Sequence, residues 1–485
     1  MKMWPETSVS FRTGDEKLQR VYDAAEEKCR LNLKDFGGRT VLVEGGGYEK
    51  IWLETQPMGG EMYALRNPEA ALNNCLLFME HQRADGRLPG SIRFTEGQTV
   101  PEYNKYQGFC FPYPALNLYY LTGEDPAYLA ALEDCLVRFD ECLWRTRHLT
   151  GDGILSSFCV YDTGEDLAVR YGDAPCWWEE DRPPEGCQTV PMGSMDVTSW
   201  SVAARRTLAE IARIRRDPAA ETWAGKAEEA AKALRRGLWD EKRGAMYDRD
   251  SRGNRIDILC HNTLRCMYWE SVSPEMAGRF VREHLLNLEE FWTPFPLPSV
   301  AVNDPAFRNA PENNWSGQPE GLTWQRAILA LERYGYDRIV TALGRKLIDA
   351  VDRNGCRFTQ QFDPFTGEAS LVHAVTHQPV TPGSGEPVQD SYGPTMLACL
   401  EYIAHIWGIR PHLGEVWFSL GSGEPYEYKA EFYGHRYAIR SSGKQAEILV
   451  DGKRILARAC GVRVITGAGG VLRGIVPIEG EEEAR

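Results

Sequence analysis

The sequence predicts a mainly α-helical protein in which a closed ring of helical hairpins, an (α/α) toroid, carries a small β appendage at its C-terminal end. Apolar residues recur at spacings of three and four over most of the chain, which is the period of an amphipathic helix. The helical segments are joined, on alternate connections, by long loops rich in glycine, proline and aromatic residues. After Gly414 the pattern changes to short runs typical of strands.

The helical pattern is clearest after Asp125. Asp125 is suited to cap a helix and Pro126 to its first turn, and an apolar stripe follows between residues 129 and 143. Similar segments begin near Asp15, Pro68, Ser199, Pro218, Pro274, Gly321, Asp337 and Pro394. Their order predicts hairpins that pack side by side.

The long loops are the second element of the prediction. They cover residues 83–124, 145–195, 287–320 and 354–393. A long irregular loop inside a compact domain is either functional or conceals an element. Because these loops lie on alternate connections, we expect them to gather at one end of the ring and to form the walls of a pocket.

The C-terminal part reads as a β appendage. Residues 446–450 turn through Asp451-Gly452 into residues 453–458, and Asp-Gly between β-rich runs indicates a hairpin. The predicted domains are therefore the helical ring at 1–413, the appendage at 414–478 and an acidic tail at 479–485.

Composition excludes several classes of function. The 485 residues carry a formal charge of −14, whereas binding to nucleic acid needs a basic face. No window holds about 18 consecutive apolar residues, and the first residues lack the apolar region of a signal peptide, so we expect a cytoplasmic protein that binds neither nucleic acid nor membrane. The 13 cysteines include no C-x-x-C pair, which favours reduced thiols in the core. No metal or other cofactor is implied, and oligomerisation stays open.

The residues that can carry chemistry are acids in loops. Asp162, Glu165 and Asp166 lie within five residues. Crowded carboxylates raise one another's pKa, and a general acid needs a proton near pH 7, although a solvated acidic loop has the same composition. Glu61 follows two glycines that permit close approach, and is either a site residue or a helix-entry carboxylate. Asp196 is expected to cap the helix that follows it.

His373 and His377 have a spacing that binds zinc on a helix. Prolines follow at once and no third ligand is evident, so a metal site is not predicted.

Ten short motifs in the same order resemble the catalytic domain of glycoside hydrolase family 63 and its bacterial mannosylglycerate- and glucosylglycerate-hydrolase relatives. The resemblance covers residues 45–408. The motifs lie at 60–63, 82–92, the Gln107 loop, 151–155, 162–166, 238–240, 291–300, 314–319, 333–336 and 362–368.

This resemblance implies an (α/α)6 barrel and an inverting glycosidase that acts at the end of a small oligosaccharide or glycoside, an α-glucoside or α-mannoside. It implies that Asp166 is the general acid. Residues implied to contact the sugar are Glu61, Tyr63, Gln107, Asp162, Trp315 and Gln318. Trp177, Trp178 and Trp292 are aromatic loop residues that can stack on sugar rings or pack beneath the loops.

The pattern breaks at the general base. The family has a Glu three residues before an Asp-Pro, and this chain has Gln360 there. A neutral amide does not take a proton from water. One hypothesis is that another carboxylate has taken over, and Glu320 is the first candidate because the family has an aromatic residue there.

Three alternatives to a relocated base stay open. In inverting phosphorolysis phosphate attacks, and cations such as Arg66, Arg170, His373 and His377 would hold it. The chain could also be a sugar-binding relative without turnover, or carry an engineered acid-to-amide change. A sugar epimerase that uses the two histidines is the third alternative.

Overall fold

The computed structural model describes residues 6–312 and 314–480, and most of this part of the chain folds into helices and the loops between them. The α-helices are α1 (Glu16–Leu31), α2 (Gln56–Tyr63), α3 (Pro68–Glu80), α4 (Pro112–Leu121), α5 (Pro126–Arg147), α6 (Met195–Arg215), α7 (Ala219–Leu238), α8 (Asn262–Tyr268), α9 (Pro274–Phe280), α10 (Gly321–Glu332), α11 (Asp337–Arg353) and α12 (Gly393–Trp407). The expectation of a mainly α-helical protein is confirmed.

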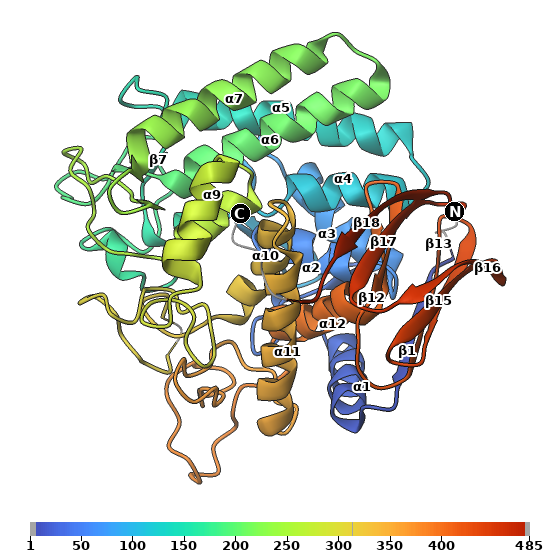
Figure 1. The fold of residues 1–485 in the computed structure, drawn as a ribbon. Helices are drawn as coiled ribbons and strands as arrows, with labels where there is room; N and C mark the ends of the chain where they lie inside the picture. Colours follow the sequence, from blue (N-terminus) through green and yellow to red (C-terminus); the bar gives the residue numbers. More distant parts are fainter. Residues whose placement is uncertain (1–5, 313, 481–485) are drawn as a thin grey trace.

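The even-numbered helices form an inner layer. Each of α2, α4, α6, α8 and α10 contacts the next, and α12 contacts both α10 and α2. The sequence of contacts therefore closes on itself. The odd-numbered helices pack outside: α3 and α5 against their neighbours in this ring, α7 against α6, and α11 and α1 against α12 (Figure 1).

Inner and outer helices differ in their burial. α8 has every residue buried, and α4 has all but two. Outer helices such as α11 and α7 bury one face only. Because a helix that is buried all round has no polar face, α2, α4 and α8 lack the amphipathic period. The loop predicted at 83–124 conceals such a helix, because α4 lies within it, as do the strands β5 (Ser91–Thr95) and β6 (Gln98–Glu102).

The caps of the outer helices agree with the sequence. Asp15 accepts the amide of Leu18 and Asp125 that of Ala127. The cap of α6 is Ser194 rather than Asp196, which lies one residue inside the helix and is fully buried.

The other long loops gather on one side of the molecule, away from the C-terminal strands (Figure 1). They contain short strands and single turns: β7 (Ser156–Ser157), η1 (Val160–Asp162), η2 (Val169–Tyr171) and β8 (Met192–Gly193). The remaining short elements are β2 (Leu33–Asp35), β3 (Thr40–Leu42), β4 (Lys50–Trp52), β5 (Ser91–Thr95), β6 (Gln98–Glu102), β9 (Trp239–Asp240), β10 (Ala245–Met246) and η3 (Val281–Leu285).

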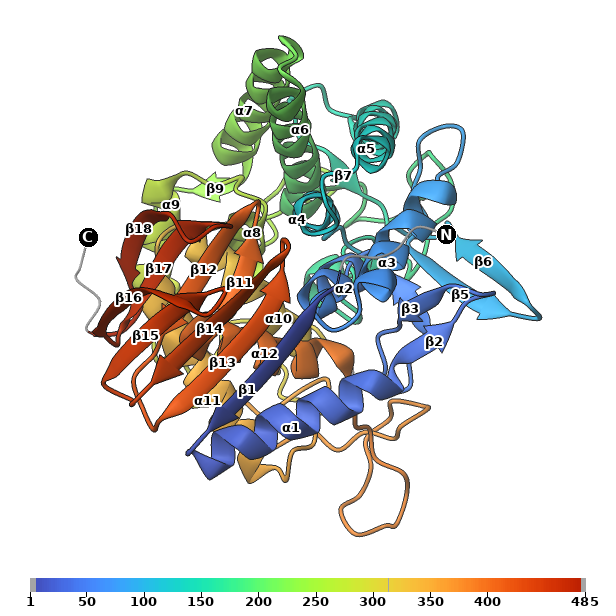
Figure 2. The same ribbon diagram turned by 90° about the vertical axis from the view of Figure 1, so that its right-hand side faces the viewer.

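Two antiparallel sheets form the β region. One sheet has the order β1-β13-β14-β15-β16 and the other β11-β12-β17-β18 (Figure 2). Their strands are β1 (Ser8–Thr13), β11 (Ile409–His412), β12 (Glu415–Leu420), β13 (Tyr426–Phe432), β14 (His435–Ser441), β15 (Gln445–Val450), β16 (Lys453–Ala459), β17 (Val462–Gly467) and β18 (Leu472–Pro477). The region begins at Ile409, not at 414, and takes its edge strand β1 from the start of the chain.

A buried ionic cluster joins this region to the helices. Arg463 of β17 lies 2.6 Å from Glu332 of α10 and 2.5 Å from Asp337 of α11, and Arg410 of β11 lies 2.9 Å from Glu332. The β region therefore packs directly against the helices α10 and α11. Of the predicted acidic tail, Glu479 pairs with Arg345 at 2.6 Å, and residues 481–485 lie outside the described part of the chain.

Candidate active site

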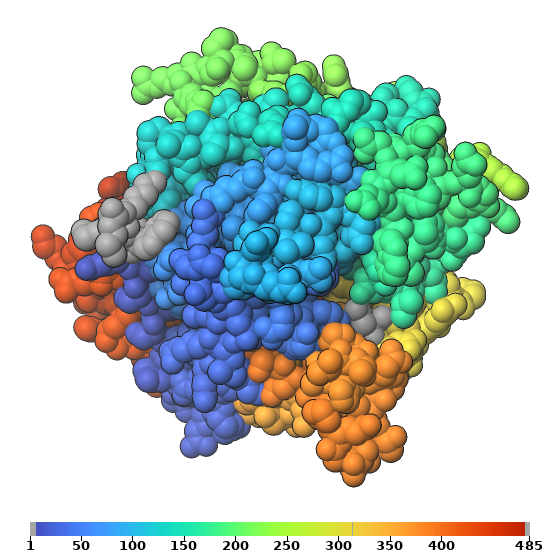
Figure 3. Space-filling view, turned by 180° about the vertical axis from the view of Figure 1, so that it is seen from behind, coloured from blue at the N-terminus to red at the C-terminus, as the bar shows by residue number. Residues whose placement is uncertain are grey.

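A cavity of about 310 Å³ opens among the long loops. Figure 3 shows the face on which the N-terminal segment (blue), the loops near residues 150–190 (green) and those near 354–390 (orange) meet. The lining residues are Glu44, Tyr48, Lys50, Trp52, Glu54, Thr55, Glu102, Asn104, Lys105, Gln107, Tyr161, Gly164, Asp166, Trp177, Trp315, Leu322, Gln360 and Tyr392. The mixture of carboxylates, amides and aromatic rings suits a polar ligand with apolar faces, such as a sugar.

Asp166 lies in a loop that is fastened on both sides. Its carbonyl accepts the amide of Trp315 at 2.9 Å, and the hydroxyl of Ser316 donates to the carbonyl of Leu167 at 2.7 Å. Asp166 itself is half-buried and lines the cavity. The loop therefore presents this carboxyl to the cavity from a fixed backbone.

A glycine turn presents a second carboxylate. Gly45, Gly46 and Gly47 all have positive φ and follow Glu44 directly. A Cβ at Gly45 would lie 2.1 Å from the side-chain nitrogen of Asn32, so only glycine fits there. The turn pairs the backbone of Tyr48 with that of Gly45, the residue that follows Glu44. The phenol of Tyr392 donates to Glu44 Oε1 at 3.0 Å.

Gln360 and Glu320 lie near this turn. The phenol of Tyr48 donates to Gln360 Oε1 at 3.0 Å, and the amide of Gly321 donates to the carbonyl of Gln360 at 2.8 Å. Gln360 lines the cavity, whereas Glu320 has no solvent exposure and is not among the lining residues. Burial raises the pKa of Glu320 well above its ordinary value, the charge of Asp166 raises it further, and a hydrogen bond from Gln360 opposes the shift.

Glu54 is a third carboxylate of the lining, and it is buried. Burial raises its pKa to about 7, although Arg326 and Arg265 oppose the shift. Arg326 lies 2.5 Å from Glu54 Oε1. Gly164 makes room for the carboxylate, because a Cβ there would lie 2.0 Å from Glu54 Oε2.

Two lysines are the cations of the lining. Lys50 lies 2.7 Å and Lys105 3.7 Å from Glu102, and both stand over the ring of Trp52 at 5.0 and 5.6 Å. Burial lowers the pKa of Lys105, and Glu102 opposes that shift.

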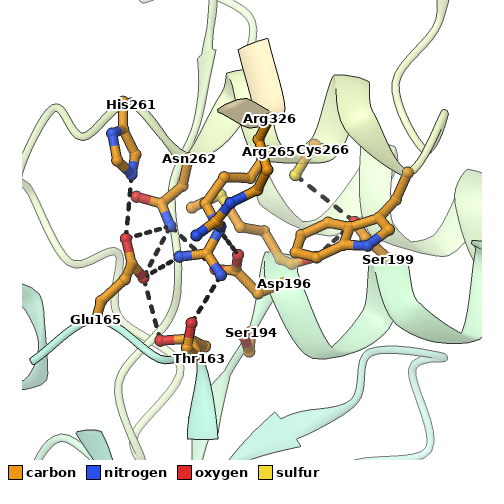
Figure 4. A network of polar contacts seen from close by, with 12 residues as sticks. Thr163, Glu165, Ser194, Asp196, Ser199, His261, Asn262, Arg265, Cys266 and Arg326 are labelled. Atoms are coloured by element: carbon orange, nitrogen blue, oxygen red, sulfur yellow. Dashed lines mark hydrogen bonds and ion pairs between the residues drawn. The ribbon is translucent and has the colours of Figure 1, made fainter. Parts of the chain in front are cut away.

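A second group of charges lies behind the Asp166 loop, and we call it the arginine network: Glu165, Arg170, Asp196, Asp248, His261, Asn262 and Arg265. Arg170 pairs with all three carboxylates of the network, with a distance of 2.9 Å to Asp196. Arg265 lies 2.9 Å from Glu165 and 2.8 Å from Asp196. Figure 4 shows Glu165 facing His261, Asn262 and Arg265. Every member is buried.

The predicted site residues separate into two sets. Asp166, Gln360, Gln107, Trp315 and Trp177 line the cavity. The set outside the lining is Glu61, Tyr63, Asp162, Gln318, Trp292 and Glu320.

The second set has other partners. Asp162 pairs with the buried Arg147 at 2.9 Å. The amide of Asn117 donates to Glu61 at 2.5 Å, and burial raises the pKa of Glu61 to about 8 with Glu401 nearby. Gln318 donates to Asn309 at 2.8 Å. These side chains hold the loops and helix ends together instead of facing the cavity.

The cations suggested for phosphate do not line the cavity either. Arg66 pairs with Glu26 at 2.7 Å, Arg170 belongs to the arginine network, and neither His373 nor His377 is in the lining. The two histidines are not on a helix, and the ring of His377 stacks on Tyr48 at 4.2 Å. Across residues 6–312 and 314–480, no three His, Cys, Asp or Glu side chains gather as a metal site.

Sequence reasoning missed Glu44, Glu54 and Lys105. The signal for Glu44 was the run Glu44-Gly-Gly-Gly-Tyr48, since three consecutive glycines beside a carboxylate indicate a tight turn at a site. The run Trp52-Leu53-Glu54 lies only a few residues before Glu61.

The sequence profile described as the mannosylglycerate hydrolase MGH1-like glycoside hydrolase domain matches residues 61–379, more than half of the 485. The chain belongs to this family. It is accordingly an enzyme that hydrolyses glycosidic bonds. Among curated proteins, none matches the sequence.

Solved structures resemble this MGH1-like glycoside hydrolase at low sequence identity. The family 63 mannosylglycerate hydrolase from Thermus thermophilus, in complex with glucose, has 16% identity and a TM-score of 0.59 over 78% of this chain and 99% of that one. A structure named sialidase has 14% identity and a TM-score of 0.71 over 95% of this chain and 41% of the other. The neutral trehalase of Saccharomyces cerevisiae has 12% identity and a TM-score of 0.53 over 76% and 74%. These likenesses concern the fold. Within the described residues, every helix is too short or too polar to cross a bilayer.

Proposed function

We propose that this MGH1-like glycoside hydrolase is a cytoplasmic, inverting, exo-acting glycosidase built on an (α/α)6 barrel, with Asp166 as its general acid. Its substrate is a small α-glucoside or α-mannoside. Asp166 protonates the oxygen of the leaving group while water attacks the anomeric carbon from the other face of the sugar.

The observation that carries this proposal is the position of Asp166 in the lining of the loop-side cavity. Asp166 also interacts with other carboxylates. Burial raises the pKa of both Glu44 and Glu320, and the charge of Asp166 raises both further. An inverting site needs two carboxyl groups about 6.5 to 9.5 Å apart, with room for water, and a cavity lined by several carboxylates supports such a site.

The two lysines of the lining favour a substrate whose leaving group carries a negative charge. Lys50 and Lys105 are the cations of the lining, and Glu102 neutralises part of their charge. A carboxylate on the aglycone, as in the glycerate bound by a similar structure, would pair with the surplus positive charge.

The test is a panel of mannosylglycerate, glucosylglycerate and the 4-nitrophenyl α-glycosides of mannose and glucose, with and without phosphate, in which NMR reports the anomer of the product. We expect phosphate-independent release of the β-anomer. Release only with phosphate would replace hydrolysis by phosphorolysis, and a retained configuration would reject inversion.

Asp166→Asn tests the acid. We expect a loss of about 10²- to 10⁴-fold in kcat on the glycerate glycosides, and a smaller loss on 4-nitrophenyl glycosides, because nitrophenolate leaves without a proton. Near-equal activity of the variant and the wild type on both kinds of substrate would remove Asp166 from this role.

A further inference from the structure

The base remains unassigned in this mechanism. Gln360 occupies the position of the base in the resembling family, and an amide does not accept the proton of water. Glu320, the first replacement suggested by the sequence, has no solvent exposure and is outside the cavity lining. A general base has to lie within hydrogen-bond reach of the water that it activates. The base should therefore be a carboxylate that faces the cavity.

We propose that Glu44 is the general base of this enzyme, an assignment that rests on the proposed function. Glu44 lines the cavity together with Asp166. It is supplied by the glycine turn at 44–48, a part of the chain that lies outside the family profile.

The backbone and the side chain of Glu44 are both fixed. Its carbonyl accepts the amide of Gly393 at 2.7 Å, and its amide donates to the carbonyl of Lys50 at 3.2 Å. Tyr392 is buried and donates its phenol proton to Oε1 at 3.0 Å. The hydrogen bond from Tyr392 therefore fixes the orientation of this carboxylate at the cavity wall.

Glu44 lies near Gln360, the position at which the resembling family has its base. Tyr48 and Tyr392 are neighbours, with ring centroids 6.2 Å apart, and their phenols donate to Gln360 and Glu44 respectively. The amide of Tyr392 also donates to the carbonyl of Phe358, two residues before Gln360, at 2.9 Å. Glu44 and Gln360 therefore belong to the same wall, and a carboxylate at 44 can serve a water that a carboxylate at 360 would otherwise serve.

Charge around Glu44 is negative. The groups that act on it are the phenol of Tyr392, the indole of Trp52 and the carboxyls of Glu54 and Asp166, with Glu320 acting on Tyr392. Burial raises the pKa of Glu44 well above its ordinary value, the Tyr392 hydrogen bond opposes this, and Glu54 and Asp166 add to it. Protonation of Asp166, which the acid role requires, removes one of these repulsions and favours the ionised form of Glu44.

Glu44 takes one proton from water as the oxygen of that water bonds to the anomeric carbon. The bond between that carbon and the leaving oxygen breaks, its electron pair goes to the oxygen, and Asp166 supplies the proton. The products are the inverted sugar and the free aglycone, and the two carboxyls exchange their protonation states through solvent.

The experiment compares Glu44→Gln with Glu49→Gln, the same substitution at an exposed residue of the neighbouring turn that pairs with Lys34. With the glycoside that the wild type hydrolyses in the panel above, we expect Glu44→Gln to lose about 10²- to 10⁴-fold in kcat, and Glu49→Gln to match the wild type. Glu44→Asp, which keeps the carboxyl, should regain part of the activity. The fall of kcat/KM at low pH, caused by protonation of the base, should vanish from the residual rate of Glu44→Gln.

Rescue by azide distinguishes a general base from a residue that only stabilises the structure. In Glu44→Ala, azide can occupy the vacated space and attack the anomeric carbon without a base, so an inverted glycosyl azide should form and release of the aglycone should recover. Activity of both Glu44→Gln and Glu44→Ala within tenfold of the wild type would overturn the assignment, and so would azide rescue in Glu320→Ala but not in Glu44→Ala. A wild type that hydrolyses nothing in the panel would instead reject the proposed function, and this assignment with it.

Discussion

Two groups of carboxylates meet at the 162–170 loop, the arginine network and the carboxylates of the cavity, and they differ in the cations that they contact. In the arginine network, Glu165 meets both Arg170 and Arg265. Burial raises the pKa of Glu165, but the two arginines reverse the shift and hold that pKa well below its ordinary value. In the cavity, burial raises the pKa of Glu44 well above its ordinary value, and no arginine is among the main opposing groups.

The difference suggests that carboxylates paired with arginine stabilise the fold, whereas those that face the cavity are suited to proton transfer. A carboxylate that is paired with arginine stays ionised and fixes the loop to which it belongs. A buried carboxylate that faces other carboxylates has a raised pKa and holds a proton more readily, and perturbed groups of this kind cluster at catalytic sites. Glu165 and Asp166 are adjacent in the sequence, yet Glu165 belongs to the arginine network and Asp166 lines the cavity, so the proposed function places a structural and a catalytic carboxylate side by side.

The largest expected effect comes from breaking the arginine network. Arg170→Met leaves Glu165, Asp196 and Asp248 buried with one arginine fewer. We expect a loss of about 3–5 kcal/mol in the free energy of unfolding, the usual cost of an uncompensated buried charge. Urea denaturation followed by tryptophan fluorescence measures it.

Arg473→Met is the matched control, because Arg473 is exposed and its pair with Glu415 at 2.9 Å lies on the surface. We expect a loss below about 1 kcal/mol there. Equal losses in the two variants would show that the network does not stabilise the fold more than a surface pair does.

A smaller effect is expected from Glu54, which lies in contact with both groups. Its pKa is raised from 4.5 to about 7, so the folded protein binds this proton more tightly than the unfolded chain does. Its contribution to stability is therefore fully present below pH 4.5 and is lost as the pH rises through 7. The difference amounts to about 3 kcal/mol.

Glu54→Gln should remove this part of the pH dependence. The free energy of unfolding, measured in urea between pH 5 and pH 8, should decline less steeply for Glu54→Gln than for the wild type. Glu49→Gln serves as the control for the substitution itself. Parallel curves for Glu54→Gln and the wild type would contradict a raised pKa at Glu54.

The sequence predicted every outer helix but only part of the inner ring, where α10 and α12 begin within one residue of their predicted starts and α2, α4 and α8 were not predicted. The outer helices α1, α3, α5, α9 and α11 begin within one residue of their predicted starts, because each has a polar and an apolar face and most have a capping residue. The buried inner helices α2, α4 and α8 have no such contrast. The sequence predicted that the C-terminal part forms strands, but it did not predict that β1 joins them. The pairing of β1 with β13 joins residues more than 400 positions apart, and local patterns do not encode such a contact.

Residues of the candidate site could be predicted where they belong to motifs that occur in the same order as in the resembling family. Asp166 and Gln360 come from motifs in a family order, and both line the cavity. Glu54 lies just before α2 and Glu61 in the last turn of that helix, and only the fold distinguishes the one held by Asn117 from the one beside Gly164. Glu44 gains its setting from Tyr392, which is distant in sequence. Their roles in catalysis stay predictions.

The smallest expected effect concerns the exposed rim of the cavity. Trp177 is 59% exposed and lines the cavity beside Tyr161, so its ring is available to stack on a sugar. Trp177→Ala should raise KM about three- to tenfold, the equivalent of a stacking interaction of about 0.5–1.5 kcal/mol. Neither kcat nor the free energy of unfolding should change appreciably, because the side chain supports no core. The neighbouring Trp178, whose indole donates to the carbonyl of Arg182 at 2.7 Å and which is outside the lining, provides the control. If Trp178→Ala raises KM as much as Trp177→Ala, the effect comes from the loop's conformation and not from a ring that meets the substrate.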